Sequence, residues 1–159
     1  MALSHHYAVR VDWTGNLGTG TDTYRSYSRD HDVSSDGVPT LLGSADPTFR
    51  GDRSRWNPEQ FLLAALAQCH MLSFLSHCAR SGVVVLSYTD EAEATMETSG
   101  GGGRFTSAML RPRVVIAEES MLEKAIALHG PASQDCFIAS SVNFPVHHEP
   151  VVTVRVTGS

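Results

Sequence analysis

Three cysteines, Cys69, Cys78 and Cys136, are the most reactive side chains in this sequence of 159 residues. The thiolate, and not the thiol, is the nucleophile, so the surroundings of a cysteine decide whether it reacts or only packs. Cys69 and Cys78 lie in NPEQFLLAALAQCHMLSFLSHCARSG, residues 57–82, which is apolar on every side when drawn as a helix. This stretch therefore holds either inert core cysteines or a reactive thiol kept away from water.

The helix predicted over residues 57–82 has clear signals at both ends. Asn57 is a favoured N-cap residue, and Gln60 can close a capping box with it. Glu59 falls in the first turn, where the helix dipole favours a carboxylate. Gly82 is a typical C-terminal stop. The boundaries of this helix are thus predicted from local signals alone.

The two cysteines of this helix point in opposite directions. At about 100° per residue, the nine positions from Cys69 to Cys78 turn the helix by roughly half a revolution. We interpret Cys78 as a core residue, since free cysteine is among the most buried residue types. A helix with no polar stripe must be covered on all sides, and one small sheet covers only one side. A second subunit is therefore expected to cover the other.

The rest of the chain predicts strands around the long helix, and a second, shorter helix. Strands are expected at residues 7–13, 24–33, 83–98, 105–119 and 143–156, with a mostly irregular segment at 34–56. A capping box of Ser120 and Glu123 predicts a helix to about His129, which Gly130 and Pro131 should break or kink. This order favours a single α+β domain over residues 1–159, with antiparallel sheet rather than a doubly wound one.

Composition and charge indicate which kinds of binding partner are unfavourable for this protein. The formal net charge of −5, without a basic block, argues against nucleic acid or an anionic membrane. No uninterrupted apolar run approaches ~18 residues, and MALSHHYAVR lacks the apolar core of a signal peptide. We therefore expect a cytoplasmic protein. An odd number of cysteines in a reducing compartment argues against a structural disulfide framework.

The segment NPEQFLLAALAQC resembles the helix signature of the OsmC/Ohr family, the osmotically inducible and organic hydroperoxide resistance proteins. Asn-Pro-Glu is followed by apolar, alanine-rich residues and a cysteine ten positions after the glutamate, a spacing that Glu59 and Cys69 keep. The family has a second cysteine at a late helical turn, which Cys136 in SQDCFIASSV matches. His70 and Phe137 stand where the family often has an apolar residue and a proline, which suggests a divergent branch.

This resemblance implies an intertwined homodimer and a thiol peroxidase that needs no cofactor or metal. The Cys69 thiolate would attack the distal oxygen of an organic hydroperoxide, giving an alcohol and a sulfenic acid. Cys136 would then condense with the sulfenic acid to form a disulfide. An external dithiol of the lipoyl type would return the pair to the reduced state.

The reactive thiolate also needs a cation. An apolar site disfavours the charged thiolate, and Cys69 lies too far along its helix for the dipole to help much. The resemblance implies an arginine that is held by the glutamate of the Asn-Pro-Glu motif, here Glu59. We favour Arg29 in SRDHDVSSDG, while Arg25 and Arg50 stay open as alternatives.

Two other functions would use the same residues. A protein with this fold could bind a hydrophobic ligand or sense redox state without catalysis. A metal site could use Cys69 and His70 with His147 or His148. His70 and His77, seven apart, share a helix face, but two helix histidines without a third ligand are more often polar contacts. His31, close to Arg29 in the sequence, could also reach the reactive site.

Overall fold

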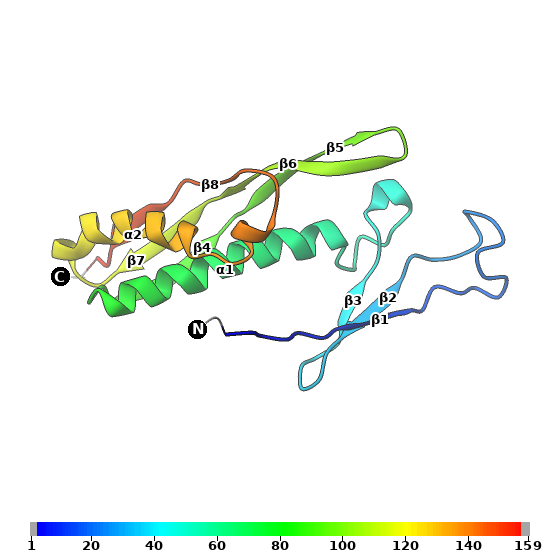
Figure 1. Ribbon diagram of the computed structural model, residues 1–159, viewed down its shortest axis with the longest axis horizontal. Coiled ribbons are helices and arrows are strands. Elements are labelled where there is room, and N and C mark those ends of the chain that lie inside the picture. Colours follow the sequence, from blue (N-terminus) through cyan, green and yellow to red (C-terminus); the bar gives the residue numbers. More distant parts are fainter. Residues whose placement is uncertain (1–2, 157–159) are drawn as a thin grey trace. The chain divides into compact units, whose positions relative to one another are not determined.

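The structure is a computed structural model that describes residues 3–156 (Figure 1). The chain divides into two compact units, with the boundary between Leu62 and Leu63. Helices and mainly antiparallel sheets alternate along it, which confirms the predicted α+β class.

The first unit contains a three-stranded antiparallel sheet in the order β1-β2-β3. Its strands are β1 (Arg10–Trp13), β2 (His31–Ser34) and β3 (Leu41–Gly43). A 3-10 helix, η1 (Pro47–Phe49), follows the sheet. The strand predicted at residues 7–13 is present at Arg10–Trp13, and the segment 34–56, predicted to be mostly irregular, contains the short strand β3.

The strand predicted over residues 24–33 is wrong in its first part, which is a turn-rich loop that ends at β2. The Ser26 hydroxyl hydrogen-bonds two carbonyls of this loop. The Arg29 guanidinium donates to the carbonyls of Tyr24 and Tyr27, both at 2.7 Å. Such bonds between side chains and nearby backbone compete with a sheet ladder. Arg29 therefore lies in the loop and not on a strand.

The long helix α1 (Pro58–Arg80) begins and ends as predicted. The Gln60 amide donates to Asn57 Oδ1 at 2.8 Å, and the Asn57 amide donates to Gln60 Oε1 at 3.2 Å. This reciprocal pair confirms the capping box. Beyond the other end, Gly82 takes a φ of 75°, which is easy only for glycine.

The second unit contains two three-stranded sheets, with the orders β4-β7-β9 and β5-β6-β8. The strands are β4 (Val85–Asp90), β5 (Glu93–Ser99), β6 (Gly102–Leu110), β7 (Pro112–Ile116), β8 (Val146–His148) and β9 (Val151–Val154). Each strand predicted at 83–98, 105–119 and 143–156 is therefore two strands. The β5–β6 hairpin is antiparallel (Figure 1). In contrast, β8 pairs in parallel with β6, and β9 pairs in parallel with β7.

Proline and a side-chain bond explain one of these breaks. Pro112 has no amide hydrogen to donate, so the ladder is interrupted where β6 ends and β7 begins. The neighbouring amide of Arg111 donates instead to Asp90 Oδ1, at 2.7 Å. The chain then switches from one sheet to the other at this point.

The second helix, α2 (Leu122–Gln134), differs from its prediction at both ends. Ser120 lies in a 3-10 turn, η2 (Glu119–Met121), and α2 has no side-chain cap bond, so the predicted capping box is wrong. The helix also continues through Pro131 instead of breaking there. Ala125 before the proline and Ala132 after it are both buried. Their packing outweighs the low helix propensity of proline, so the helix continues.

The apolar core of the second unit joins both helices to the sheet of β4, β7 and β9. Its buried members are Phe74, Cys78, Val83, Val114, Ile116, Ala125 and Ala132. Burial raises the pKa of Cys78 to about 11, so this thiol is inert at neutral pH. Cys78 is therefore a core residue, as predicted.

Helix α1 is covered only in part by its own chain. An 18-residue window of it has a mean hydropathy of 1.4, with 22% of that window buried. By length and composition alone this helix could cross a membrane, but the central helix of a soluble fold meets the same criterion. Leu72, in the middle of α1, is 60% exposed.

We expect the chain to form a homodimer that covers this exposed part of α1, because large apolar surfaces seldom stay in contact with water. Sedimentation at micromolar concentration should give twice the chain mass of 17.2 kDa. Leu72→Lys should weaken the dimer, whereas Leu17→Lys, at an equally exposed leucine in a loop, should not. A well-folded monomer would contradict the expectation.

Candidate functional site

The second unit brings Cys69 of α1 close enough to Cys136, which follows α2, for each thiol to affect the surroundings of the other. Both are free thiols; Cys69 is half-buried and Cys136 is 1% exposed. Burial, and then the hydrogen bond with Cys69, raises the pKa of Cys136 to about 11. Cys136 is therefore protonated at neutral pH, and its S–H can donate to the sulfur of Cys69.

A tight turn holds the Cys136 sulfur in place. The amide and the hydroxyl of Ser140 donate to the Cys136 carbonyl at 3.0 and 3.1 Å. The Ala139 amide donates to the Cys136 sulfur at 3.4 Å, at the start of the 3-10 helix η3 (Ala139–Ser141). The late helical turn predicted at this cysteine is thus present. Phe137, which stands where the family often has proline, is 81% exposed.

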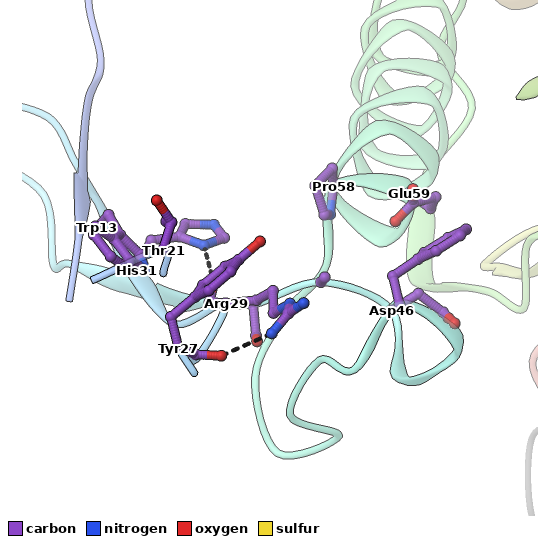
Figure 2. Close-up of a pocket in the computed structure, with 11 residues that line it drawn as sticks. Trp13, Thr21, Tyr27, Arg29, His31, Asp46, Pro58 and Glu59 are labelled. Carbon is purple, nitrogen blue, oxygen red and sulfur yellow. Dashed lines mark hydrogen bonds between the residues drawn. The ribbon is translucent and has the colours of Figure 1, made fainter. Parts of the chain in front are cut away.

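Arg29 and Glu59 line one pocket in the first unit, a cavity of about 390 Å³ (Figure 2). Its walls are mostly apolar, and the lining residues are Trp13, Thr21, Tyr27, Arg29, His31, Ser44, Ala45, Asp46, Phe49, Pro58 and Glu59. Figure 2 shows the guanidinium and the carboxylate entering this pocket from the loop before β2 and from the first turn of α1. The two candidate residues are therefore neighbours of one cavity.

Arg29 and Glu59 are not joined by an ion pair, so the expected pairing is absent between these two described residues. The Arg29 guanidinium carbon instead lies 4.3 Å from the ring centre of Tyr24 and 4.1 Å from that of Tyr27. Glu59 Oε2 is buried and has no hydrogen-bond partner among the described residues. A buried carboxylate oxygen without a partner is unfavourable, so it is ready to accept a hydrogen bond.

The two alternative arginines lie differently. Arg25 is exposed in the loop before β2, and Arg50 is exposed at the end of η1, with a left-handed φ of 67°. Neither lines the pocket of Arg29. His31 does line it, and its Nδ1 lies 2.9 Å from the Arg29 carbonyl oxygen.

A buried histidine cluster is the feature that sequence reasoning missed. His70 Nε2 of α1 lies 3.0 Å from His129 Nδ1 of α2, and the ring of His148 is 5.3 Å from that of His70. Phe74 stacks on His129 with ring centres 3.9 Å apart. The sequence grouped His70 with His148 only as possible metal ligands, and no sequence signal pointed to His129.

This cluster bears on the metal hypothesis, which used Cys69 and His70 with His147 or His148. Among the described residues, no group of three histidine, cysteine, aspartate or glutamate side chains has the arrangement of a metal site. His70 makes its hydrogen bond to His129, and His147 is exposed. The geometry gives this hypothesis no support.

Comparison with known proteins gives one consistent result. A family model described as OsmC-like protein matches residues 51–150. A solved structure of an OsmC-like protein of unknown function from Vibrio cholerae is 33% identical, with a TM-score of 0.83, and the match covers 93% of this chain and 100% of that one.

More distant relatives extend over the whole chain as well. The uncharacterised protein YmaD of Bacillus subtilis is 22% identical over 158 residues, which is 97% of each chain. An organic hydroperoxide resistance protein from Elizabethkingia anophelis shares the fold with a TM-score of 0.66 at 17% identity, over 96% of this chain and 100% of that one.

The histidine cluster predicts how stability depends on pH. Burial, and then the neighbouring imidazoles, lower the pKa of His70 to about 4 and that of His129 to about 3. In the unfolded chain a histidine titrates near ~6.5, so below that pH the unfolded state binds more protons. We expect the free energy of unfolding to fall as pH drops from 6.5 to 5, by at most ~2 kcal/mol for each histidine.

Urea unfolding at pH 7.5 and pH 5 measures this loss. His129→Phe should reduce the difference between the two pH values, because one proton-binding group is removed. His147→Gln, at an exposed histidine, is the control and should leave the difference unchanged. Equal stability of the wild-type protein at both pH values would contradict the prediction.

Proposed function

Because the chain belongs to the OsmC-like family, we propose that it is a thiol peroxidase that reduces organic hydroperoxides to alcohols. The observation that carries the proposal is the proximity of the Cys69 and Cys136 thiols. A half-buried thiol next to a buried, protonated one is the arrangement that a peroxide-reactive and a resolving cysteine require. The printed name of a relative with the same fold, an organic hydroperoxide resistance protein, supports the substrate class.

The reaction follows from the difference between the two thiols. The Cys69 thiolate attacks the distal oxygen of the hydroperoxide, the O–O bond breaks, and the alkoxide takes a proton and leaves as an alcohol. The Cys136 thiol then attacks the sulfur of the resulting sulfenic acid, forming the disulfide and releasing water. An external dithiol, of the lipoyl type in our proposal, then reduces the Cys69–Cys136 disulfide by two thiol–disulfide exchange steps and is itself oxidised to a disulfide.

Cys136 has a second use in the reduced state. Its proton is retained at neutral pH, because burial raises the pKa of this thiol to about 11. A protonated Cys136 carries no negative charge that would repel an anionic sulfur beside it, and its S–H is able to donate to that sulfur.

We assign the activating cation to Arg29 and its orientation to Glu59. Both line the apolar pocket of the first unit, whose walls suit the organic group of a hydroperoxide. Glu59 Oε2, buried without a partner, would be satisfied by a guanidinium N–H, and a bidentate pair would fix the arginine fork. The working state in this proposal is a homodimer in the cytoplasm.

Steady-state turnover tests the proposed function. Purified protein with cumene hydroperoxide and a dihydrolipoyl reductant should show peroxidase activity that Cys69→Ser abolishes. Cys136→Ser should still consume one equivalent of peroxide, because Cys69 remains, but should not turn over through a disulfide. Cys78→Ser is the matched control and should stay active, since that thiol is in the core. Absence of turnover with cumene, lipid and hydrogen peroxides would contradict the proposal.

Substitutions in the pocket test the assigned cation. Arg29→Ala should lower the rate constant for reaction with peroxide by on the order of a hundredfold. In other enzymes, removal of one donor that stabilises charge in the transition state has an effect of this size. Arg29→Lys should lose much of the rate, because lysine brings charge without the planar fork. Arg25→Ala is the control and should keep the wild-type rate. Loss of activity in Arg25→Ala or Arg50→Ala, but not in Arg29→Ala, would refute the assignment.

Glu59 has a competing explanation that the same assay separates. A carboxylate in the first turn stabilises a helix by ~0.3–1 kcal/mol without any catalytic role. If Glu59 only supports the helix, Glu59→Ala lowers the melting temperature and keeps the rate per folded enzyme. If it orients Arg29, the variant has an intermediate rate and a nearly unchanged melting temperature.

The apolar pocket also favours a second candidate, a non-enzymatic protein that binds a hydrophobic ligand or senses redox state. A cavity of about 390 Å³ with mostly apolar walls is of the size that small ligands occupy. Turnover separates the two functions. A ligand carrier would bind an apolar probe with equal affinity in wild type and in Cys69→Ser, and neither protein would consume peroxide catalytically.

A further inference from the structure

A second contact joins the same two segments that carry the cysteine pair. His77 Nε2 of α1 lies 2.8 Å from Asp135 Oδ2, and Asp135 is the residue directly before Cys136. His77 follows Cys69 by eight positions on the helix, which is about 12 Å along its axis. Helix α1 therefore contacts the residues at the end of α2 at two points, a thiol pair and an imidazole–carboxylate pair.

Asp135 is well placed to control the position of its neighbour. It is the C-cap residue of α2, and its amide donates to the Pro131 carbonyl at 3.0 Å. The His77 side chain is 24% exposed and that of Asp135 is 64% exposed, so water can replace the bond if either partner is removed. Directly after Cys136, the Phe137 side chain is 81% exposed, and among the described residues the turn that follows hydrogen-bonds only to Cys136 and its immediate neighbours. Asp135 thus fixes the backbone directly before Cys136, while the side chain directly after it, Phe137, is exposed.

We infer that His77 and Asp135 are positioning residues that hold Cys136 beside Cys69 and so determine how readily the disulfide closes. Disulfide formation requires the two Cα atoms to lie within ~7 Å of each other. It becomes less favourable when the segment that carries Cys136 is more mobile, because the effective concentration of its thiol near Cys69 falls. The closing step is unchanged in its chemistry: the Cys136 thiol attacks the sulfenic sulfur and water leaves. The inference rests on the proposed function for its use in turnover, because it concerns the same cysteine pair.

Redox equilibrium tests the positioning role without any peroxide. The Cys69–Cys136 disulfide is equilibrated in glutathione buffers, and its fraction is measured by alkylation and mass. His77→Gln and Asp135→Asn should each lower the equilibrium constant for closure about tenfold, which is a reduction potential higher by about 30 mV. The double exchange His77→Asp with Asp135→His should recover most of the loss, because the pair is rebuilt in reverse.

Glu93→Gln is the matched control. It removes a carboxylate from another exposed ion pair of the second unit, in which Arg111 Nη1 lies 3.0 Å from Glu93 Oε2. This variant should keep the wild-type equilibrium constant, and all variants should melt within the same narrow range in the reduced state. Wild-type closure in His77→Gln and Asp135→Asn, or an equal loss in Glu93→Gln, would overturn the inference.

A peroxide pulse separates this inference from the proposed function. With one equivalent of cumene hydroperoxide, both variants should oxidise Cys69 at the wild-type rate but close the disulfide about tenfold more slowly. Their sulfenic acid should accumulate as a dimedone adduct, and excess peroxide should give more sulfinic acid than in wild type. Failure of wild-type Cys69 to react with any hydroperoxide would refute the proposed function, and the glutathione equilibrium would still decide the role of His77 and Asp135.

Discussion

The packing of α1 against α2 is the constraint on which the chemistry of the second unit depends. Cys69 lies on the first helix and Cys136 follows the second, so their contact exists only while the helices keep their relative position. Phe74, Ala125 and Ala132 belong to one buried core and hold that position without directional bonds. The position of the cysteine pair is thus set by apolar packing, and the proximity of the two thiols is a consequence of it.

Polar groups reinforce the same interface at two places. The bond between His70 and His129 lies inside it, where both imidazoles are neutral because burial lowers the pKa of each. The bond between His77 and Asp135 lies at its more exposed end. We expect the buried pair to make the packing sensitive to acid, and we propose that the exposed pair acts on the turn that carries Cys136. In these proposals, stability and redox behaviour are linked through one helix pair.

The parts predicted correctly from the sequence are those controlled by local signals. The capping box of Asn57 and Gln60, the stop at Gly82 and the opposed directions of Cys69 and Cys78 each follow from residues close in the chain. The resemblance to a known family added Cys136, which spacing alone does not identify. The contact of these two cysteines is present, while their catalytic roles stay a prediction.

Features that depend on distant partners were not predictable in this way. His129 lacked any motif, and its importance comes only from His70 and Phe74 of another helix. The break between β6 and β7 lies at Pro112, where the chain changes from one sheet to the other. Helix α2 continues through Pro131 because the burial of its apolar side outweighs the local preference for a break. Arg29 was expected on a strand, but the carbonyls of two nearby tyrosines hold it in a loop. In each case a tertiary contact outweighed the local preference.

The central claim is that Cys69 and Cys136 form one peroxide-driven redox pair, and mass mapping of the disulfide tests it most directly. Reduced protein is treated with one equivalent of an organic hydroperoxide, alkylated, digested and mapped by mass spectrometry. The account predicts that two free thiols are lost within one chain, that the linked peptides contain Cys69 and Cys136, and that Cys78 stays free. A disulfide that contains Cys78, or a chain that keeps all three thiols, would contradict it.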